Sequence, residues 1–145
     1  MAINNKEIQD YLNNSKSLVL ATVNNAGEPD IRTLGGYGIS EFEIYFATAK
    51  ESNKVKQLDV NNEVAVLFQH ENQVIPDFLN ITLYGKAVPV KGEDFAAGKA
   101  VIAKRRPQNA AAEQTHNIYR IKPERIKVLD FKASNPEERV YTITL

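Results

Sequence analysis

The sequence predicts a mainly β protein with short helices, arranged as a closed or nearly closed antiparallel barrel. About eight short apolar strands recur at near-even spacing along the 145 residues, and three helical segments interrupt them. No internal repeat, low-complexity tract or interdomain linker breaks this series, so we expect one domain over residues 1–145. Closing the sheet also removes the edges that alternating apolar strands would otherwise expose.

The first half of the chain is predicted to contain a helix, three strands and a second helix. These elements are expected at residues 4–12, 17–23, 28–37, 42–48 and 52–60. In the first helix, Ile8, Tyr11 and Leu12 are spaced three and four residues apart and form one apolar face. The strand at residues 17–23 is rich in valine and leucine, and Asn-Asn-Ala-Gly follows it with residues that tolerate a tight turn.

The second half is predicted to contain two strands, a helix and three more short strands. These elements are expected at residues 64–69, 80–90, 92–106, 115–123, 125–132 and 138–145. Gly85 is expected to break the second of these strands, because glycine weakens a strand interior. The helix has acidic residues in its first turn and basic residues in its last, as the helix dipole favours, and Pro107 stops it.

The composition excludes several classes of function. Eighteen basic and eighteen acidic residues give a formal net charge of zero, so no global field attracts nucleic acid or anionic lipid. The absence of cysteine excludes disulfides, thiolate metal sites and a cysteine nucleophile, and two histidines leave little for a metal site. The N-terminus lacks the layout of a signal peptide, and no apolar run approaches membrane-spanning length. We therefore expect a cytoplasmic protein without metal, membrane or nucleic-acid partners.

Polar residues in the stretch between residues 18 and 58 predict an anion site. They close two strands and open the second helix: Arg32, Thr33, Thr48, Ser52, Asn53 and Lys54. A strand cation that faces a helix N-terminus forms a cradle for a phosphate, because backbone N–H groups and the helix dipole already favour an anion there. The alternative is that Arg32 and Lys54 are solvated surface charges and that Ser52 serves only as an N-cap.

The order of these motifs resembles the pyridoxamine 5′-phosphate oxidase-like flavoproteins. A G-x-P-x-x-R-T strand, an F-x-T strand end, an S-x-K helix start and an N-P-E-R-like tail follow one another along the chain. The matching residues are Gly27, Pro29, Arg32, Thr33, Thr48, Ser52 and Lys54. The resemblance runs from about Leu18 to about Phe131. It implies an antiparallel split β-barrel that binds FMN, forms a homodimer with the cofactor at the subunit interface, and acts as an oxidoreductase on a small-molecule substrate.

The resemblance also implies roles for individual residues. Arg32 and Lys54 would neutralise the FMN phosphate, with help from Ser52 and Asn53 at the helix start. Four residues would present side chain or backbone to the isoalloxazine ring: Thr33, Leu34, Ala47 and Thr48. Asn80 would reach the flavin from the partner subunit and Arg139 would approach the ring. The alternative for Asn80 is a turn, since an asparagine before a strand usually belongs to one. The sequence identifies no catalytic residue.

The substrate side departs from the true oxidases of this family. Those enzymes carry a basic residue a few positions beyond the flavin-binding arginine, a C-terminal Arg-x-His pair and a tryptophan near the flavin. This chain has Gly36 and Tyr37 in the first region, Arg139 alone in the second, and no tryptophan. Only Arg106, before Pro107, resembles the segment with which the true oxidases bind the substrate phosphate. The chain therefore resembles the general stress protein or flavin oxidoreductase-like branch more than the true oxidase.

Two other functions remain as alternatives. A non-catalytic protein that binds a flavin, a tetrapyrrole or a deazaflavin would use the same fold. A small barrel that binds nucleic acid is the third option, but the zero net charge and the few aromatic residues that alternate with basic ones argue against it.

Overall fold

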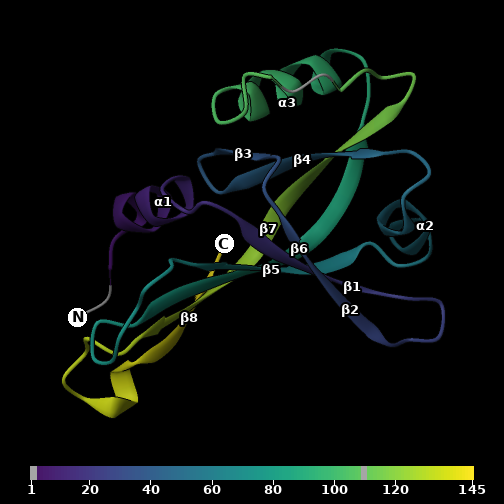
Figure 1. The fold of residues 1–145 in the computed structure, drawn as a ribbon. Coiled ribbons are helices and arrows are strands. Elements are labelled where there is room, and N and C mark those ends of the chain that lie inside the picture. The colour runs from purple at the N-terminus through teal and green to yellow at the C-terminus, as the bar shows by residue number, and fades with distance from the viewer. Residues whose placement is uncertain (1–2, 109–110) are drawn as a thin grey trace.

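One antiparallel sheet of eight strands makes up most of the computed structural model, which describes residues 3–108 and 111–145 (Figure 1). The strands are β1 (Leu18–Val23), β2 (Pro29–Leu34), β3 (Tyr37–Ser40), β4 (Glu43–Ala49), β5 (Glu63–Gln69), β6 (Leu79–Val90), β7 (His116–Asp130) and β8 (Val140–Thr144). Their order is β2-β1-β5-β6-β7-β4-β3, and β8 pairs with β7. Because Gly35 and Gly36 join the two outermost strands of this order, the sheet curls back on itself. The predicted split barrel is confirmed.

All three predicted helices are present: α1 (Asn5–Asn13), α2 (Asn53–Val60) and α3 (Glu93–Ala103), with a short 3-10 helix η1 (Pro136–Glu138) near the end of the chain. Asn4 caps α1 in a capping box with Glu7, and Ser52 caps α2. Helix α3 packs on β3 and β4, and α2 packs on β1 and β4 (Figure 1). Among the described residues, no helix is long and apolar enough to cross a membrane.

The number of strands agrees with the prediction, but their division along the chain differs in two places. Residues 28–37 form two strands, β2 and β3, because the chain leaves one edge of the sheet at Gly35 and Gly36 and enters the other. Within residues 115–132, expected as two strands, the single strand β7 runs from His116 to Asp130, and Gly85 does not break β6.

A bulge explains why β6 and β7 continue past Gly85 and Pro123. Tyr84 pairs with Arg125, whereas the next residue, Gly85, pairs with Pro123, so that Glu124 is the extra residue on β7. A Cβ at position 85 would lie 2.5 Å from the Lys122 carbonyl oxygen. Glycine is therefore required at this position to let the two backbones approach.

The core lies inside the curled sheet and follows the pairing register. Leu20, Val66, Leu83 and Ile126 stand opposite one another on β1, β5, β6 and β7, and each has 0% of its surface exposed. On β2, the residue that pairs with Leu20 is Arg32. The same register that builds the core therefore directs an arginine toward the interior at the edge of the barrel.

Gly38 on β3 marks the closest approach of α3 to the sheet. A Cβ at this position would lie 2.5 Å from the Val101 carbonyl oxygen, and backbone atoms cannot yield without moving the helix. We expect Gly38→Ala to lower the free energy of unfolding by about 1–3 kcal/mol, as measured by urea denaturation.

Gly36→Ala is the matched control, since a Cβ there would meet nothing within 4 Å. Its effect should stay within about 0.5 kcal/mol. Equal losses in the two variants would show that α3 does not press on β3 as described.

Candidate anion-binding site

Arg32 is held by a network of three side chains. Its Nη1 donates to Thr22 Oγ1 at 2.6 Å, and its Nη2 donates to Asp30 Oδ2 at 2.9 Å and to Gln57 Oε1 at 3.0 Å. Gln57 in turn donates from Nε2 to Asp30 Oδ2 at 3.1 Å, and the Thr22 hydroxyl donates to Gln57 Oε1. Strand alternation places Asp30 and Arg32 on the same face, and α2 brings Gln57 to them. The guanidinium is consequently fixed, with 19% of the Arg32 side chain exposed.

A second contact ties the end of β4 to the start of α2. Thr48 is buried, and its Oγ1 lies 2.9 Å from Ser52 Oγ. Ser52 Oγ also accepts from the Val55 N–H at 3.4 Å, while the Ser52 N–H donates to the Ala49 carbonyl at 3.0 Å. These bonds set the N-terminus of α2 against the sheet.

Lys54, in the first turn of α2, is half-buried close to Arg32. Burial lowers the pKa of the Lys54 ammonium, and the positive charge of Arg32 lowers it further. Within residues 3–108 and 111–145, no hydrogen bond or ion pair holds this ammonium. Two cations therefore stand together at a helix N-terminus, and Asp30 pairs with one of them, Arg32.

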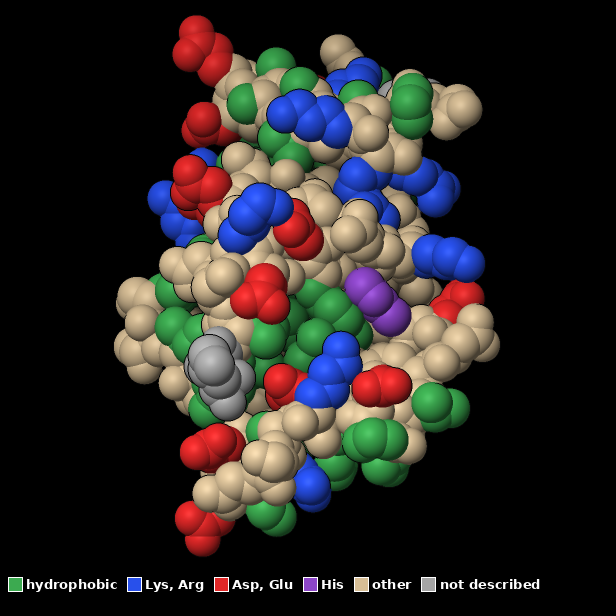
Figure 2. Space-filling model, turned by 90° about the vertical axis from the view of Figure 1, so that its left-hand side faces the viewer, with side chains coloured by type: hydrophobic (Ala, Val, Ile, Leu, Met, Phe, Trp, Pro, Cys, Tyr) green, Lys and Arg blue, Asp and Glu red, His purple; other side chains and the backbone are tan. Residues whose placement is uncertain are grey.

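The cation pair lies beside a hollow at the surface. The face of the molecule on the left of Figure 1, away from α2, carries Lys and Arg side chains interspersed with Asp and Glu side chains (Figure 2). Next to Arg32, a hollow of about 350 Å³ opens between the β1–β2 turn and α2. Its lining comprises Asn24, Asn25, Ala26, Asn53, Lys56 and Gln57. The predicted site residue Asn53 is exposed on this side of α2.

The structure brings most of the predicted site residues together and leaves two apart. Thr33 and Leu34 follow Arg32 on β2, and Ala47 precedes Thr48 on β4. Asn80 lies on β6, which β1 and β5 separate from β2.

Arg139 follows η1, and its Nε donates to the Ala133 carbonyl at 3.2 Å. The next residue, Val140, pairs with Leu129 on β7, and Leu129 also pairs with Asn80 on β6. In Figure 1, η1 and α2 lie at opposite sides of the sheet. Within one chain, Asn80 and Arg139 are therefore neighbours of each other and not of Arg32.

Three residues of the Arg32 network were not predicted from the sequence: Thr22, Asp30 and Gln57. The sequence could have indicated Asp30, because residues two apart on a strand share a face and Asp30 lies two residues before Arg32. It could not have indicated Thr22 and Gln57, since their proximity to Arg32 depends on the register of β1 and on the docking of α2.

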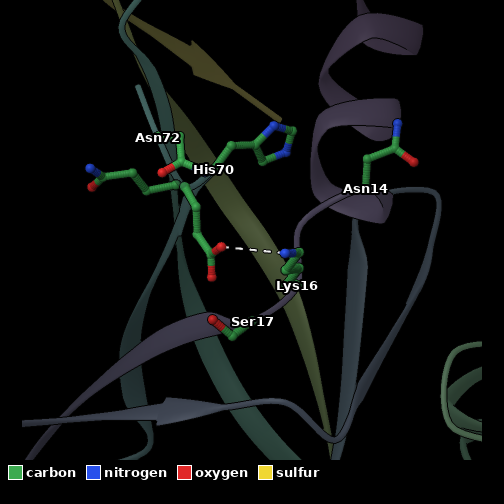
Figure 3. A pocket seen from close by; sticks show the side chains of 7 residues that line it. Asn14, Lys16, Ser17, His70 and Asn72 are labelled. Carbon is green, nitrogen blue, oxygen red and sulfur yellow. Dashed lines mark hydrogen bonds and ion pairs between the residues drawn. The ribbon is translucent and has the colours of Figure 1, made fainter. Parts of the chain in front are cut away.

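A different hollow, of about 230 Å³, lies between the end of α1 and the loop after β5 (Figure 3). Lys16 and Glu71 form an ion pair of 3.3 Å across it, and both side chains are largely exposed. The His70 ring stacks on the Tyr11 ring with centroids 3.7 Å apart, and its Nε2 lies 2.9 Å from the Tyr11 carbonyl oxygen. His70 therefore anchors this loop to α1, and its role is structural.

The lowered pKa of Lys54 leads to a prediction about the ligand-free protein. Because the folded chain holds this proton less tightly than the unfolded chain, the charged lysine destabilises the fold at neutral pH. The penalty is present below the lowered pKa and disappears as the pH rises past the unfolded value of about 10.4. Lys54→Met should therefore raise the free energy of unfolding at pH 7, by at most about 1 kcal/mol since solvent screens the charge.

Urea denaturation at pH 7 and near pH 10.5 measures this effect, and the difference between Lys54→Met and wild type should shrink at the higher pH. The control, Lys56→Met, changes an exposed lysine on the same helix and should alter the free energy of unfolding at pH 7 by no more than about 0.5 kcal/mol. A Lys54→Met effect that is equal at both pH values would contradict the account of Lys54.

Comparisons with known proteins agree with this architecture. A family model described as pyridoxamine 5′-phosphate oxidase matches residues 5–130. A conserved hypothetical protein from Mycobacterium tuberculosis superposes with a TM-score of 0.77 at 20% identity, with 91% of this chain and 88% of that chain covered. General Stress Protein 26 from Bacillus anthracis gives a TM-score of 0.69 at 19% identity, with 97% and 98% covered.

A heme binding protein from Mycobacterium smegmatis gives a TM-score of 0.76 at 14% identity, with 99% of this chain and 59% of that chain covered. A search of curated proteins found no match. The structural neighbours share the fold, whereas the family model spans most of the sequence. Taken with the curled antiparallel sheet, that match shows that the chain belongs to the pyridoxamine 5′-phosphate oxidase family.

Proposed function

We propose that this chain is an FMN-binding oxidoreductase that acts on a small molecule as a homodimer. The observation that carries the proposal is the pair of cations at the N-terminus of α2. Arg32 is fixed by its network, and Lys54 is half-buried beside it without an anionic partner among the described residues. A phosphate would relieve the repulsion between these two cations and accept charge-assisted bonds from both.

The residues present fit an FMN molecule whose phosphate lies at this helix terminus. Arg32, Ser52, Asn53 and Lys54 would hold the phosphate. Thr33, Leu34, Ala47 and Thr48 would lie along the isoalloxazine ring, as the family resemblance implies. Thr33 and Leu34 follow Arg32 on β2, and Thr48 on β4 contacts Ser52 at the start of α2. When bound, the flavin supplies hydride or electron chemistry, and the protein contributes binding and orientation.

The outer face of the sheet supports the dimer in this proposal. Ile31, Ala21 and Ala65 pair in register across β2, β1 and β5, and 68% of the Ile31 surface is exposed. Val19 and Leu67, which pair beside them, are half-exposed, so one face of β5 is buried and the other is partly open to solvent. A second copy that covers this apolar face would bring its own Asn80 and Arg139 to the flavin. This arrangement accounts for their distance from Arg32 within one chain.

Binding of a tetrapyrrole without catalysis is the second candidate. It is favoured by one observation, the fold shared with a protein described as heme binding. The absorption spectrum of the purified protein separates the two candidates, since bound flavin is yellow and heme gives a Soret band.

The phosphate role of Lys54 predicts a selective loss of affinity. Lys54→Gln should weaken FMN binding by about 1.5–3 kcal/mol, or roughly 10- to 100-fold, because one charge-assisted contact is lost. Binding of riboflavin, which lacks the phosphate, should not change. Fluorescence titration of the apo-protein with each ligand measures both values.

Lys91→Gln removes the same charge from an exposed position between β6 and α3, outside the hollow beside Arg32, and should leave both affinities near those of wild type. If Lys54→Gln weakened FMN and riboflavin equally, Lys54 would not be recognising the phosphate.

The proposed interface predicts that Ile31→Lys disrupts the dimer. Ile31 is largely exposed within one chain, so the variant should fold, whereas a lysine on the apolar face would oppose association. Sedimentation at micromolar protein should show a dimer for wild type and a shift toward monomer for the variant, together with weaker FMN binding.

Val60→Lys places the same charge on an apolar residue with 64% of its surface exposed, at the end of α2, and should remain dimeric. A monomeric wild-type protein that still binds FMN would rule out the shared site.

A further inference from the structure

The guanidinium of Arg32 has no complete edge to offer to an anion. Its Nη2 carries two hydrogens, one for each of the two edges on which a guanidinium binds an oxyanion in a bidentate manner. Asp30 Oδ2 and Gln57 Oε1 accept both of the Nη2 bonds, at 2.9 Å and 3.0 Å. A phosphate that bound Arg32 through two parallel bonds would therefore have to displace one of these partners.

Asp30 is the partner that can leave. Half of its side chain is exposed, so that its carboxylate can turn into water, and its remaining side-chain contact is the 3.1 Å bond from Gln57 Nε2. Gln57 projects from a helix and also accepts from the Thr22 hydroxyl. The hydrogen bond from Gln57 and the charge of Arg32 lower the pKa of Asp30, so it carries a negative charge at neutral pH.

We propose that Asp30 is an internal competitor that occupies Arg32 in the free protein and weakens the affinity of the site for a phosphate. The inference rests on the proposed function of this site. Asp30 is not needed to orient Arg32, because Thr22 and Gln57 hold the guanidinium from the strand and the helix. Its carboxylate binds Arg32 in place of a ligand. A doubly charged phosphate displaces this carboxylate, whereas a singly charged anion does not.

The test is Asp30→Asn, which keeps the size of the side chain and removes its charge. FMN affinity should rise about two- to fivefold, the range expected for a partly exposed ion pair, and riboflavin affinity should not change. Fluorescence titration of the apo-protein measures both. Unchanged or weaker FMN binding would overturn the proposal, since a residue that only positions Arg32 would give that result.

Glu28→Gln is the matched control. Glu28 lies two residues before Asp30 and accepts a bond from Asn24 Nδ2 at 3.2 Å. Arg32, in the described part of the chain, bonds to Thr22, Asp30 and Gln57 and not to Glu28. An equal gain in affinity in this variant would attribute the effect to general charge and would overturn the proposal. Asp30→Ser, which also removes the carboxylate, serves as the second variant should Asp30→Asn fold poorly.

A measurement with inorganic phosphate separates this inference from the proposed function. If wild type does not bind FMN, the flavin proposal fails. The competitor role then stands only if phosphate raises the thermal midpoint of Asp30→Asn more than those of wild type and Glu28→Gln. Equal shifts in the three proteins would reject it.

Discussion

The register between β1 and β2 is the constraint on which the site depends. It places Arg32 opposite Leu20, at the end of an interior row that continues through Val66 and Leu83. A cation directed toward an apolar interior costs free energy unless its donors are satisfied, and Thr22, Asp30 and Gln57 provide the acceptors. Because Gln57 belongs to α2, the same network fixes the helix whose first turn carries Lys54. A one-residue slip of β2 would direct Arg32 to the outer face and would remove the site.

The fold could be predicted from sequence because its signals are local, whereas the two errors arose where long-range pairing decides the outcome. Alternating apolar residues, the turn at residues 24–27 and the cap at Ser52 each act within a few residues. Gly35 and Gly36 resemble a bend within a strand, and only the order of the whole sheet shows that they join its two edges. Pro123 resembles a strand break, and only the bulge opposite Gly85 shows why β7 continues.

The same distinction applies to the candidate site. Arg32, Ser52 and Lys54 were predicted from charge and helix-start chemistry, which the sequence displays directly. Tyr37, in the region where the true oxidases carry a basic residue, is fully buried and donates to the Ser15 carbonyl at 2.8 Å. Arg105 stacks on it at 4.1 Å and bonds to the end of α1, so this cation joins α3 to α1. Arg106, in contrast, lies against Gly35, where a Cβ would be 3.0 Å from its Nη1, so this cation lies close to the end of β2.

Stability and binding oppose each other at the N-terminus of α2. Two cations held close together destabilise the free protein, and their repulsion is what an incoming anion would relieve. Asp30 offsets part of this repulsion within the chain, but it does so by occupying the donors that a ligand would use. A stronger internal pair would give a more stable protein with a weaker site, and the loss of Asp30 would do the reverse. Asp30 is half-exposed, so solvent screens its ion pair with Arg32 without abolishing it. Both the stability of the free protein and the affinity of the site are therefore expected to lie between these two extremes.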